Sequence, residues 1–244
     1  VNSVTVCAGN TAILAVQNPQ AGNVYNWYDA ATGGTLLASG ISYTTAPITA
    51  DTAFYVEMTA GTCNSVRTAV QVNVNNVAPA TVLADTVCNG TSAILSVQSP
   101  VPANTYNWYT AASGGASIGT GVSFTTQALS NTTTYYVESV NAGCSGTRSS
   151  VTVTVITPVS PVLAAVTVCE GSVATLTVQN PDAAHTYNWY ATATGGTVLG
   201  TGTTLITPAI IGTTVFYAES VNGSCLSLRI PVTVNAYPPL QAPV

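Results

Sequence analysis

The chain has 244 residues, of which 5% are charged and 47% are hydrophobic, and its formal net charge is −5. Soluble proteins usually carry about 25% charged residues, and the polarity of this chain comes from Thr, Ser and Asn instead. Its 3 basic residues are all arginines, too few for a basic patch, so we expect neither a nucleic-acid partner nor binding to anionic lipid. Apolar stretches never reach the ~18 residues of a membrane span, so membrane insertion is not expected either.

The predicted elements of the first third of the chain are short strands. Val70, Val72 and Val74 alternate with the polar Gln71 and Asn73, which is typical of a half-buried strand. Strands are predicted at 11–17 (TAILAVQ), 23–28 (NVYNWY), 52–58 (TAFYVEM) and 68–77 (TAVQVNVNNV). No stretch shows the 3.6-residue period of a helix. Short strands separated by Gly, Asn and Pro turns predict an all-β antiparallel sandwich.

The same elements return twice at a fixed interval. YNWY stands at 25–28, 106–109 and 187–190, which are equal steps without gaps. Such a period is the signature of a tandem array, and a unit of this length can bury a modest core of its own. We predict three domains in an extended array: 1–78, 79–159 and 160–244. The linkers between them are short and contain proline, which favours semi-rigid spacers.

Each repeat has a single tryptophan, set in YNWY. In a strand, Tyr25 and Trp27 share one face, and Asn26 and Tyr28 share the other. Burying one tryptophan fills the gap between the sheets of a small sandwich. The predicted core anchors are therefore Trp27, Trp108 and Trp189, and the alternative is an exposed platform for sugar stacking. The candidate ligand-facing residues on the opposite face are Tyr28, Tyr109 and Tyr190.

Three segments of the first repeat have counterparts in the other two: VCAGNTAILAV, YNWYDAATGGTLLASG and TAFYVEMTAGTCNSVRTAVQVNV. In this order they resemble the tandem Ig-like modules of large surface proteins in gliding, type IX-secreting bacteria. The resemblance covers nearly the whole chain. It implies Ig-like sandwiches in a secreted, cell-surface protein involved in adhesion or gliding, and no enzyme. Cys7 precedes its neighbouring strand and Cys63 follows Tyr55 by eight residues, so antibody-like strand topology is not implied.

The six cysteines form the strongest pattern. Each repeat holds two, always with the spacing of Cys7 and Cys63, and none has the Cys-x-x-Cys spacing of zinc or redox sites. In a low-charge secreted protein this pattern predicts one disulfide in each domain, with free buried thiols as the alternative. The predicted bonds are Cys7–Cys63, Cys88–Cys144 and Cys169–Cys225.

One glutamate and one arginine also recur in each repeat, ten residues apart. A hairpin that turns near residues 60–62 sets Glu57 opposite or diagonal to Arg67 on an outer sheet face. We predict structural ion pairs, worth only ~0–1 kcal/mol when exposed, between Glu57 and Arg67, Glu138 and Arg148, and Glu219 and Arg229. The alternative is a binding role for Arg67 together with Tyr28 and Tyr55.

The other polar residues predict no catalytic, cofactor or metal site. His185 is the only histidine, and its counterparts are Asn23 and Asn104, so neither a catalytic triad nor a metal site is expected. Calcium sites need clustered oxygens, whereas the aspartates do not recur between repeats; they are Asp29, Asp51, Asp85 and Asp182. Thr52 and Thr86 follow aspartates in short motifs that resemble the O-glycosylation motif of the same bacterial group.

We therefore expect a monomeric structural or adhesive segment of a secreted, cell-surface protein, acting as a stalk or adhesin in attachment or gliding. Its expected partners are neighbouring Ig-like repeats of the same chain and a surface polysaccharide or another surface protein. The alternative is an array of carbohydrate-binding modules attached to a secreted enzyme. Buried tryptophans favour the stalk, and an exposed aromatic row favours glycan binding. Neither end has the features of a signal peptide, so we expect a piece of a longer protein.

Overall fold

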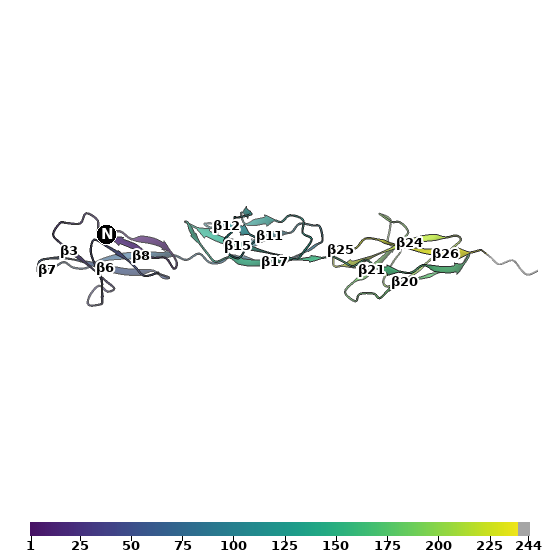
Figure 1. The fold of residues 1–244 in the computed structure, drawn as a ribbon, viewed down its shortest axis with the longest axis horizontal. Coiled ribbons are helices and arrows are strands. Elements are labelled where there is room, and N and C mark those ends of the chain that lie inside the picture. Colours follow the sequence, from purple (N-terminus) through teal and green to yellow (C-terminus); the bar gives the residue numbers. More distant parts are fainter. Residues whose placement is uncertain (239–244) are drawn as a thin grey trace, which may run out of the picture. The chain divides into compact units, whose positions relative to one another are not determined.

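The computed structural model describes residues 1–238, which form strands and no helix (Figure 1). The chain divides into two compact units. One comprises Val1–Leu83, Leu95–Phe124 and Thr134–Val151, and the other comprises Ala84–Ile94, Thr125–Thr133 and Thr152–Val244. We call residues 1–78, 79–159 and 160–244 repeats 1, 2 and 3. The division passes through repeat 2, so these domain boundaries stay a prediction.

Each repeat contributes its strands in a similar order. Repeat 1 contains β1 (Val4–Cys7), β2 (Ile13–Ala15), β3 (Val24–Tyr28), β4 (Leu36–Ser39), β5 (Ser42–Thr44), β6 (Thr52–Ala60), β7 (Cys63–Asn64) and β8 (Thr68–Asn75). Repeat 2 contains β9 (Thr81–Val82), β10 (Asp85–Cys88), β11 (Ile94–Gln98), β12 (Thr105–Tyr109), β13 (Gly119–Thr120), β14 (Ser123–Thr125), β15 (Thr133–Asn141), β16 (Cys144–Ser145) and β17 (Ser149–Ile156). Repeat 3 contains β18 (Val162–Leu163), β19 (Val166–Cys169), β20 (Thr175–Gln179), β21 (Thr186–Tyr190), β22 (Gly200–Thr201), β23 (Thr204–Ile206), β24 (Thr214–Asn222), β25 (Cys225–Leu226) and β26 (Ile230–Tyr237).

The larger sheet has the same strand order in every repeat. In repeat 1 the order is β1-β8-β6-β3-β4, with β7 paired to β6. The corresponding orders are β10-β17-β15-β12-β13 and β19-β26-β24-β21-β22. The edge strands β1, β10 and β19 run parallel to their neighbours β8, β17 and β26, with Val4 opposite Val72 in repeat 1. The sandwich is therefore antiparallel, as predicted, except at this one edge.

The smaller sheet is formed by the short strands. It consists of β2 and β5 in repeat 1, and of the orders β14-β11-β9 and β18-β20-β23 in the other repeats. Its apolar side chains meet those of the larger sheet. In repeat 1, for example, Leu14 from β2 and Val70 from β8 belong to the same buried cluster as Trp27.

The three tryptophans lie at the centre of this arrangement. Trp27, Trp108 and Trp189 are each 0% exposed, on the face of the strand that the alternation in YNWY assigns to the core. Burial also requires a partner for the indole N–H. The N–H groups donate to the carbonyls of Gly40, Gly121 and Gly202 at 2.9–3.0 Å. The indole thus anchors the core and also holds the turn that follows β4, β13 or β22.

Candidate functional site: the junctions between repeats

The disulfides join neighbouring repeats. Cys7 of repeat 1 is bonded to Cys144 of repeat 2, and Cys88 of repeat 2 is bonded to Cys225 of repeat 3, each across 137 residues with a Cα–Cα distance of 5.3 Å. Each bond lies inside one of the two compact units. The predicted bonds within repeats are therefore wrong: Cys7–Cys63, Cys88–Cys144 and Cys169–Cys225 do not form. Cys63 and Cys169 are free and exposed.

The two cysteines of one repeat lie at opposite ends of its larger sheet. Cys7 is level with Asn75, at the end of β8. Cys63 lies beside Ala60, beyond the other end of that strand. The 9 residues of β6 span roughly 27 Å at ~3.4 Å per residue, whereas a disulfide needs Cα atoms within ~7 Å of each other. A bond within the repeat is therefore geometrically impossible.

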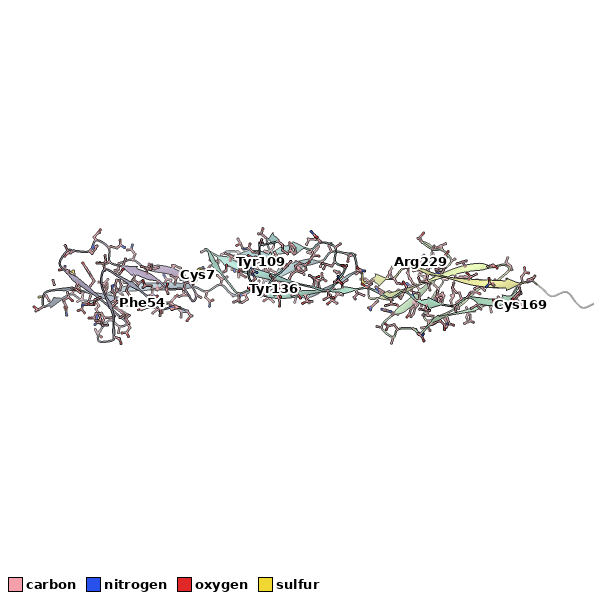
Figure 2. The ribbon with its side chains drawn as sticks, in the orientation of Figure 1. Cys7, Phe54, Tyr109, Tyr136, Cys169 and Arg229 are labelled. Carbon is pink, nitrogen blue, oxygen red and sulfur yellow. A yellow bond between two sulfur atoms is a disulfide. The ribbon has the colours of Figure 1, made fainter. Side chains whose placement is uncertain are left out.

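The first junction brings together a strand end and a hairpin. Cys7 is the last residue of β1 (Figure 2), and Cys144 opens β16, directly after the turn that follows Asn141. Beside the disulfide, the Asn75 side-chain amide donates to the Asn141 carbonyl at 2.9 Å. The turn places Ala142 in the left-handed region, with φ of 46°. We call Cys7, Cys88 and Cys169 the strand-end cysteines, and Cys63, Cys144 and Cys225 the hairpin cysteines.

The second junction repeats the first. Cys88 ends β10 opposite Ile156, and Cys225 opens β25 opposite Asn222. The linker is also bound to the following repeat, because the Ser220 hydroxyl donates to the Val159 carbonyl. Each junction therefore combines a covalent bond with contacts between the preceding segment and the β-hairpin of the next repeat.

The arginine of each repeat holds a loop closed. In repeat 1 the Arg67 Nε lies 3.3 Å from a Glu57 oxygen, and one terminal nitrogen donates to the Ala30 and Gly33 carbonyls at 2.6 and 2.5 Å. Both side chains are mostly buried, at 12% and 13% exposure. The pairs Arg148–Glu138 and Arg229–Glu219 have nitrogen–oxygen distances of 3.8 and 3.2 Å and the same type of contact with loop carbonyls. The ion pairs are thus largely enclosed, in contrast to the exposed pairs considered from the sequence.

The regularly spaced tyrosines lie under these arginines. The guanidinium carbon is 3.4, 3.3 and 3.2 Å from the ring centroids of Tyr28, Tyr109 and Tyr190. Tyr109 and Tyr190 are only 8% and 6% exposed, and the Tyr190 hydroxyl donates to Glu219 at 2.6 Å. Burial, followed by the neighbouring Glu219, raises the pKa of Tyr190 above its ordinary value. The sequence pattern makes these rings candidates for facing a ligand. In the structure Tyr109 and Tyr190 instead lie in buried cation–π stacks under Arg148 and Arg229. Tyr109 and Arg229 are labelled in Figure 2.

The remaining polar candidates serve local backbone contacts. Oxygens of Asp29, Asp51 and Asp182 accept from the backbone N–H groups of residues 35, 74 and 184. His185 lies 3.7 Å from Asp182. Residues 1–238 hold no group of three metal-binding side chains. In the same range no helix is long and apolar enough to cross a membrane.

The two candidate glycosylation sites differ in exposure. Thr86 is exposed in β10, whereas Thr52 is half-buried in β6 and its hydroxyl donates to the Ala50 carbonyl at 2.8 Å. Thr86 is the more accessible acceptor of the two. Modification of either residue stays a prediction.

The sequence did not reveal the residues that flank the junction disulfides. Asn75 and Asn141 are the clearest case, because their contact spans two repeats. No periodic signal marks them, since the position of Asn75 is Ile156 in repeat 2. The sequence does contain one signal for bonds between repeats. The separation of 137 residues between a strand-end cysteine and the hairpin cysteine of the next repeat recurs just as regularly as the spacing within a repeat.

Comparison with known proteins gives a family for the whole chain. None of the curated proteins compared with the chain matches it. Among solved structures, the chain is similar to DIP-gamma IG1+IG2 (17% identity, 64% of this chain and 94% of that chain, TM-score 0.30) and to murine CEACAM1b (17%, 65% and 99%, TM-score 0.32). The fibronectin(III)-like modules of Clostridium thermocellum CbhA match at 13% identity over 65% of this chain and 94% of theirs, with a TM-score of 0.35.

A family match is the stronger finding. The family described as "Ig-like domain CHU_C associated" matches residues 1–75, 77–156 and 158–238. Together these ranges cover nearly the whole chain. The chain therefore belongs to the CHU_C-associated Ig-like domain family, which it carries as three tandem copies.

Proposed function

We propose that the chain is a structural and adhesive segment of a large bacterial cell-surface protein, and that it acts as a stalk in attachment or gliding without enzymatic activity. The observation that supports this most strongly is the pair of disulfides that join each repeat to the next. Disulfides persist in oxidising, extracellular settings. A bond inside each domain stabilises that domain alone, whereas bonds across junctions strengthen the array as a whole.

The bonds limit how far the chain extends under force. When both ends are pulled, tension passes along residues 1–7 and through the Cys7–Cys144 disulfide. It then runs back along residues 144 to 88, through the Cys88–Cys225 disulfide, and along residues 225–244. The covalent path then contains about 84 residues, or ~290 Å at ~3.5 Å per residue. A fully reduced chain of 244 residues reaches ~850 Å by the same measure. Most of repeats 1 and 3 therefore lies off the path of tension, as suits a stalk that must not lengthen.

Single-molecule pulling tests this role. The variant Cys63→Ser, Cys169→Ser retains both junction bonds and has no thiol available for exchange. We expect an oxidised molecule, tethered by its ends, to stop lengthening at ~290 Å and to reach ~850 Å after reduction.

A matched variant, Cys7→Ser with Cys88→Ser, cannot form either junction bond and should reach the longer extension without reductant. An oxidised Cys63→Ser, Cys169→Ser molecule that lengthens well beyond ~300 Å would count against the stalk. So would a length that reduction leaves unchanged.

Adhesion through glycans finds less support among the described residues. The three tryptophans are fully buried, and Tyr109 and Tyr190 lie beneath arginines. The three tryptophans and these two tyrosines are therefore not available for sugar stacking. We expect the partners to be neighbouring Ig-like repeats and a surface polysaccharide or surface protein. The carbohydrate-binding alternative would be favoured by two results together. The chain would bind soluble oligosaccharides, and a tyrosine-to-alanine change at 28, 109 or 190 would abolish this binding without unfolding the repeat.

A further inference from the structure

An open groove lies beside the core of repeat 1. It has a volume of about 340 Å³, and all the residues that line it belong to the segment 29–54. Its apolar wall includes Leu37 from β4, Tyr43 from β5 and Phe54 from β6, and Phe54 is labelled in Figure 2. Asp29, which follows β3 directly, lines the same groove. The groove thus combines an apolar wall with one carboxylate, as ligand sites commonly do.

One alanine helps to keep this groove open. Ala38 stands where repeat 2 has Gly119. A Cβ at Gly119 would lie 2.7 Å from the Phe124 ring, which stacks on the tryptophan of repeat 2 with the ring centroids 5.7 Å apart. In repeat 1 this Cβ is present, and the counterpart of Phe124 is Tyr43, whose centroid is 6.2 Å from that of the tryptophan. The extra methyl group therefore holds the Tyr43 ring further from the indole.

The neighbouring side chains are also more open in repeat 1. The counterparts of Phe54 are Tyr135 and Phe216, which are 6% and 5% exposed, whereas Phe54 is only half-buried. Strand β4 contains a bulge at Leu37, between two residues that pair with β3, and bulges re-aim side chains beside binding sites. The groove is therefore a feature of the residues of repeat 1 and does not follow from the Ig-like fold alone.

Asp29 is held in place with one oxygen free. Its Oδ1 accepts from the backbone N–H of Thr35 at 2.7 Å, and an added Cβ on Gly34 would collide with the same oxygen. Asp29 is exposed, and within residues 1–238 it belongs to no ion pair and its Oδ2 accepts no hydrogen bond. The corresponding residues of repeats 2 and 3 are Thr110 and Ala191, so this carboxylate is specific to repeat 1.

The chain has few cations, and they are engaged elsewhere. It contains no lysine, and its three arginines are paired with glutamates, with arginine side chains only 10–14% exposed. Carboxylates such as Asp29, Asp51 and Glu170 are exposed, and the formal net charge is −5. A partner that supplies a cation therefore complements both the groove and the surface around it.

A lysine side chain fits this arrangement better than an arginine. The ammonium group donates readily to a single carboxylate oxygen, whereas the planar guanidinium is suited to both oxygens at once. One oxygen of Asp29 is already engaged by Thr35. The lysine stem also packs well along apolar surface, which Tyr43 and Phe54 provide with their ring centroids 5.6 Å apart.

We propose that the groove of repeat 1 binds a lysine side chain of a partner surface protein, with the ammonium on Asp29 Oδ2 and the stem against Tyr43 and Phe54. Such a lysine is the partner chemistry for the adhesive role proposed above, and the inference rests on that role. Lysine binding does not involve the junction disulfides. Its failure and the failure of the stalk in pulling experiments are therefore distinguishable.

Nuclear magnetic resonance of the isotope-labelled full chain tests this site directly. The probe is Nα-acetyl-lysine methylamide, which presents a lysine side chain without a charged backbone. We expect saturable shifts at the amides of Thr35 and Phe54, with a dissociation constant on the order of millimolar, and no shifts at the matching residues Tyr135 and Phe216. The same probe acetylated at Nε has lost its charge and should bind about tenfold more weakly.

Three variants separate the groove from general charge attraction. Asp29→Asn keeps the acceptor for Thr35 but loses the charge, and it should weaken binding of the lysine probe roughly tenfold. Glu170→Gln removes the same charge from an exposed position in repeat 3 and should leave the affinity unchanged. Ala38→Gly should weaken binding, because the Tyr43 ring can then move toward the indole and narrow the groove.

The indole N–H signal of Trp27 reports whether each variant retains its core. The proposal is overturned if the folded native chain shows no saturable shifts, or if the shifts spread equally over the three repeats. Unchanged binding by folded Asp29→Asn or Ala38→Gly would also overturn it. So would tighter binding at Thr35 and Phe54 by the arginine analogue of the probe or by methyl glucoside, which would assign the groove to an arginine or to a sugar.

Discussion

At the scale of single residues, the tryptophan of each repeat is the largest fully buried side chain among the described residues. Trp27 is 0% exposed and its indole N–H donates to the Gly40 carbonyl at 2.9 Å. Replacing it with Ala leaves a large cavity, and we expect the stability of repeat 1 to fall by about 3–5 kcal/mol. Trp27→Phe should cost less, because the ring still fills much of the space and only the hydrogen bond is lost.

Hydrogen exchange followed by mass spectrometry can localise this effect. Faster exchange in β3, β6 and β8, with β24 and β26 of repeat 3 unchanged, is the expected pattern. Equal loss of protection in repeats 1 and 3 would show that the core of repeat 1 does not stand by itself.

The arginines provide a graded test of the buried ion pairs. Glu219 is 5% exposed, so Arg229→Ala leaves a buried carboxylate with the Tyr190 hydrogen bond but without its cationic partner, at a cost of about 3 kcal/mol. Arg148→Ala should cost less, since the Glu138 side chain is 19% exposed and its nitrogen–oxygen distance is 3.8 Å. Urea unfolding of the two variants gives the comparison. Equal effects would indicate that the contacts with loop carbonyls, and not the carboxylates, carry the stability.

Tyr190 should make stability depend on alkaline pH. Its pKa is raised above the ordinary value of 10.0, first by burial and then by Glu219. The folded state therefore holds the phenolic proton more tightly than the unfolded state does. Its contribution to stability is complete below pH 10 and is lost as pH rises through the folded pKa. Unfolding free energies measured from pH 9 upward should fall less steeply for Tyr190→Phe than for the native chain, and identical slopes would contradict this assignment.

At the scale of elements, the hairpin of repeat 2 contains a strained turn. Ala142 adopts φ of 46°, whereas the equivalent residues of repeats 1 and 3 are Gly61 and Gly223, with φ of 58° and 60°. A left-handed conformation costs a residue with a Cβ about 1–2 kcal/mol. Glycine avoids this cost but loses more conformational entropy on folding, so the net gain from Ala to Gly is smaller. Ala142→Gly should therefore stabilise the β15–β16 hairpin by roughly 0.5–1 kcal/mol.

The reverse change serves as the matched control. Gly223→Ala should weaken the β24–β25 hairpin by a similar amount, visible as faster hydrogen exchange near Cys225. If both substitutions shift exchange in the same direction, backbone strain is not the cause.

Elements were also the scale at which the sequence was most informative. Strand positions and the burial of Trp27 could be predicted, because an alternation with period two directly reflects one buried face. The parallel pairing of Val4 with Val72 could not be predicted, since alternation does not encode strand direction. The enclosed stack of Arg229 on Tyr190 was also hidden, because it depends on loop carbonyls from residues 192 and 195.

The disulfide connectivity shows why the junctions could not be predicted. Every cysteine recurs at the same interval, so the spacing within a repeat and the spacing between bonded cysteines are equally periodic. Choosing between them requires knowing which end of the sheet each cysteine occupies. Cys7 is level with Asn75, and Cys63 is level with Ala60. These positions depend on how the strands pair, and the spacing of the cysteines along the sequence does not reveal that pairing.

At the scale of the whole molecule, we expect an extended array. A strand of ~10 residues spans about 33 Å, so three domains end to end should reach roughly 100–130 Å. A single globule of the same mass is far more compact. Small-angle X-ray scattering of the oxidised chain measures the maximum dimension. A value of about 60 Å, which is typical of a globule of this size, would show repeats folded back on one another.

The central claim is that the repeats are linked to one another by disulfides, and trypsin tests it most directly. Cleavage after Arg67, Arg148 and Arg229 gives four peptides. Peptides 1–67, 68–148 and 149–229 each hold one strand-end and one hairpin cysteine, and peptide 230–244 holds none. The chain is denatured, its free thiols are blocked with N-ethylmaleimide, and it is digested without reduction. We predict that the three peptides with cysteines remain joined as one species, with one blocked thiol at Cys63 and one at Cys169. Three separate peptides, each closed by its own internal bond and carrying no label, would contradict the account.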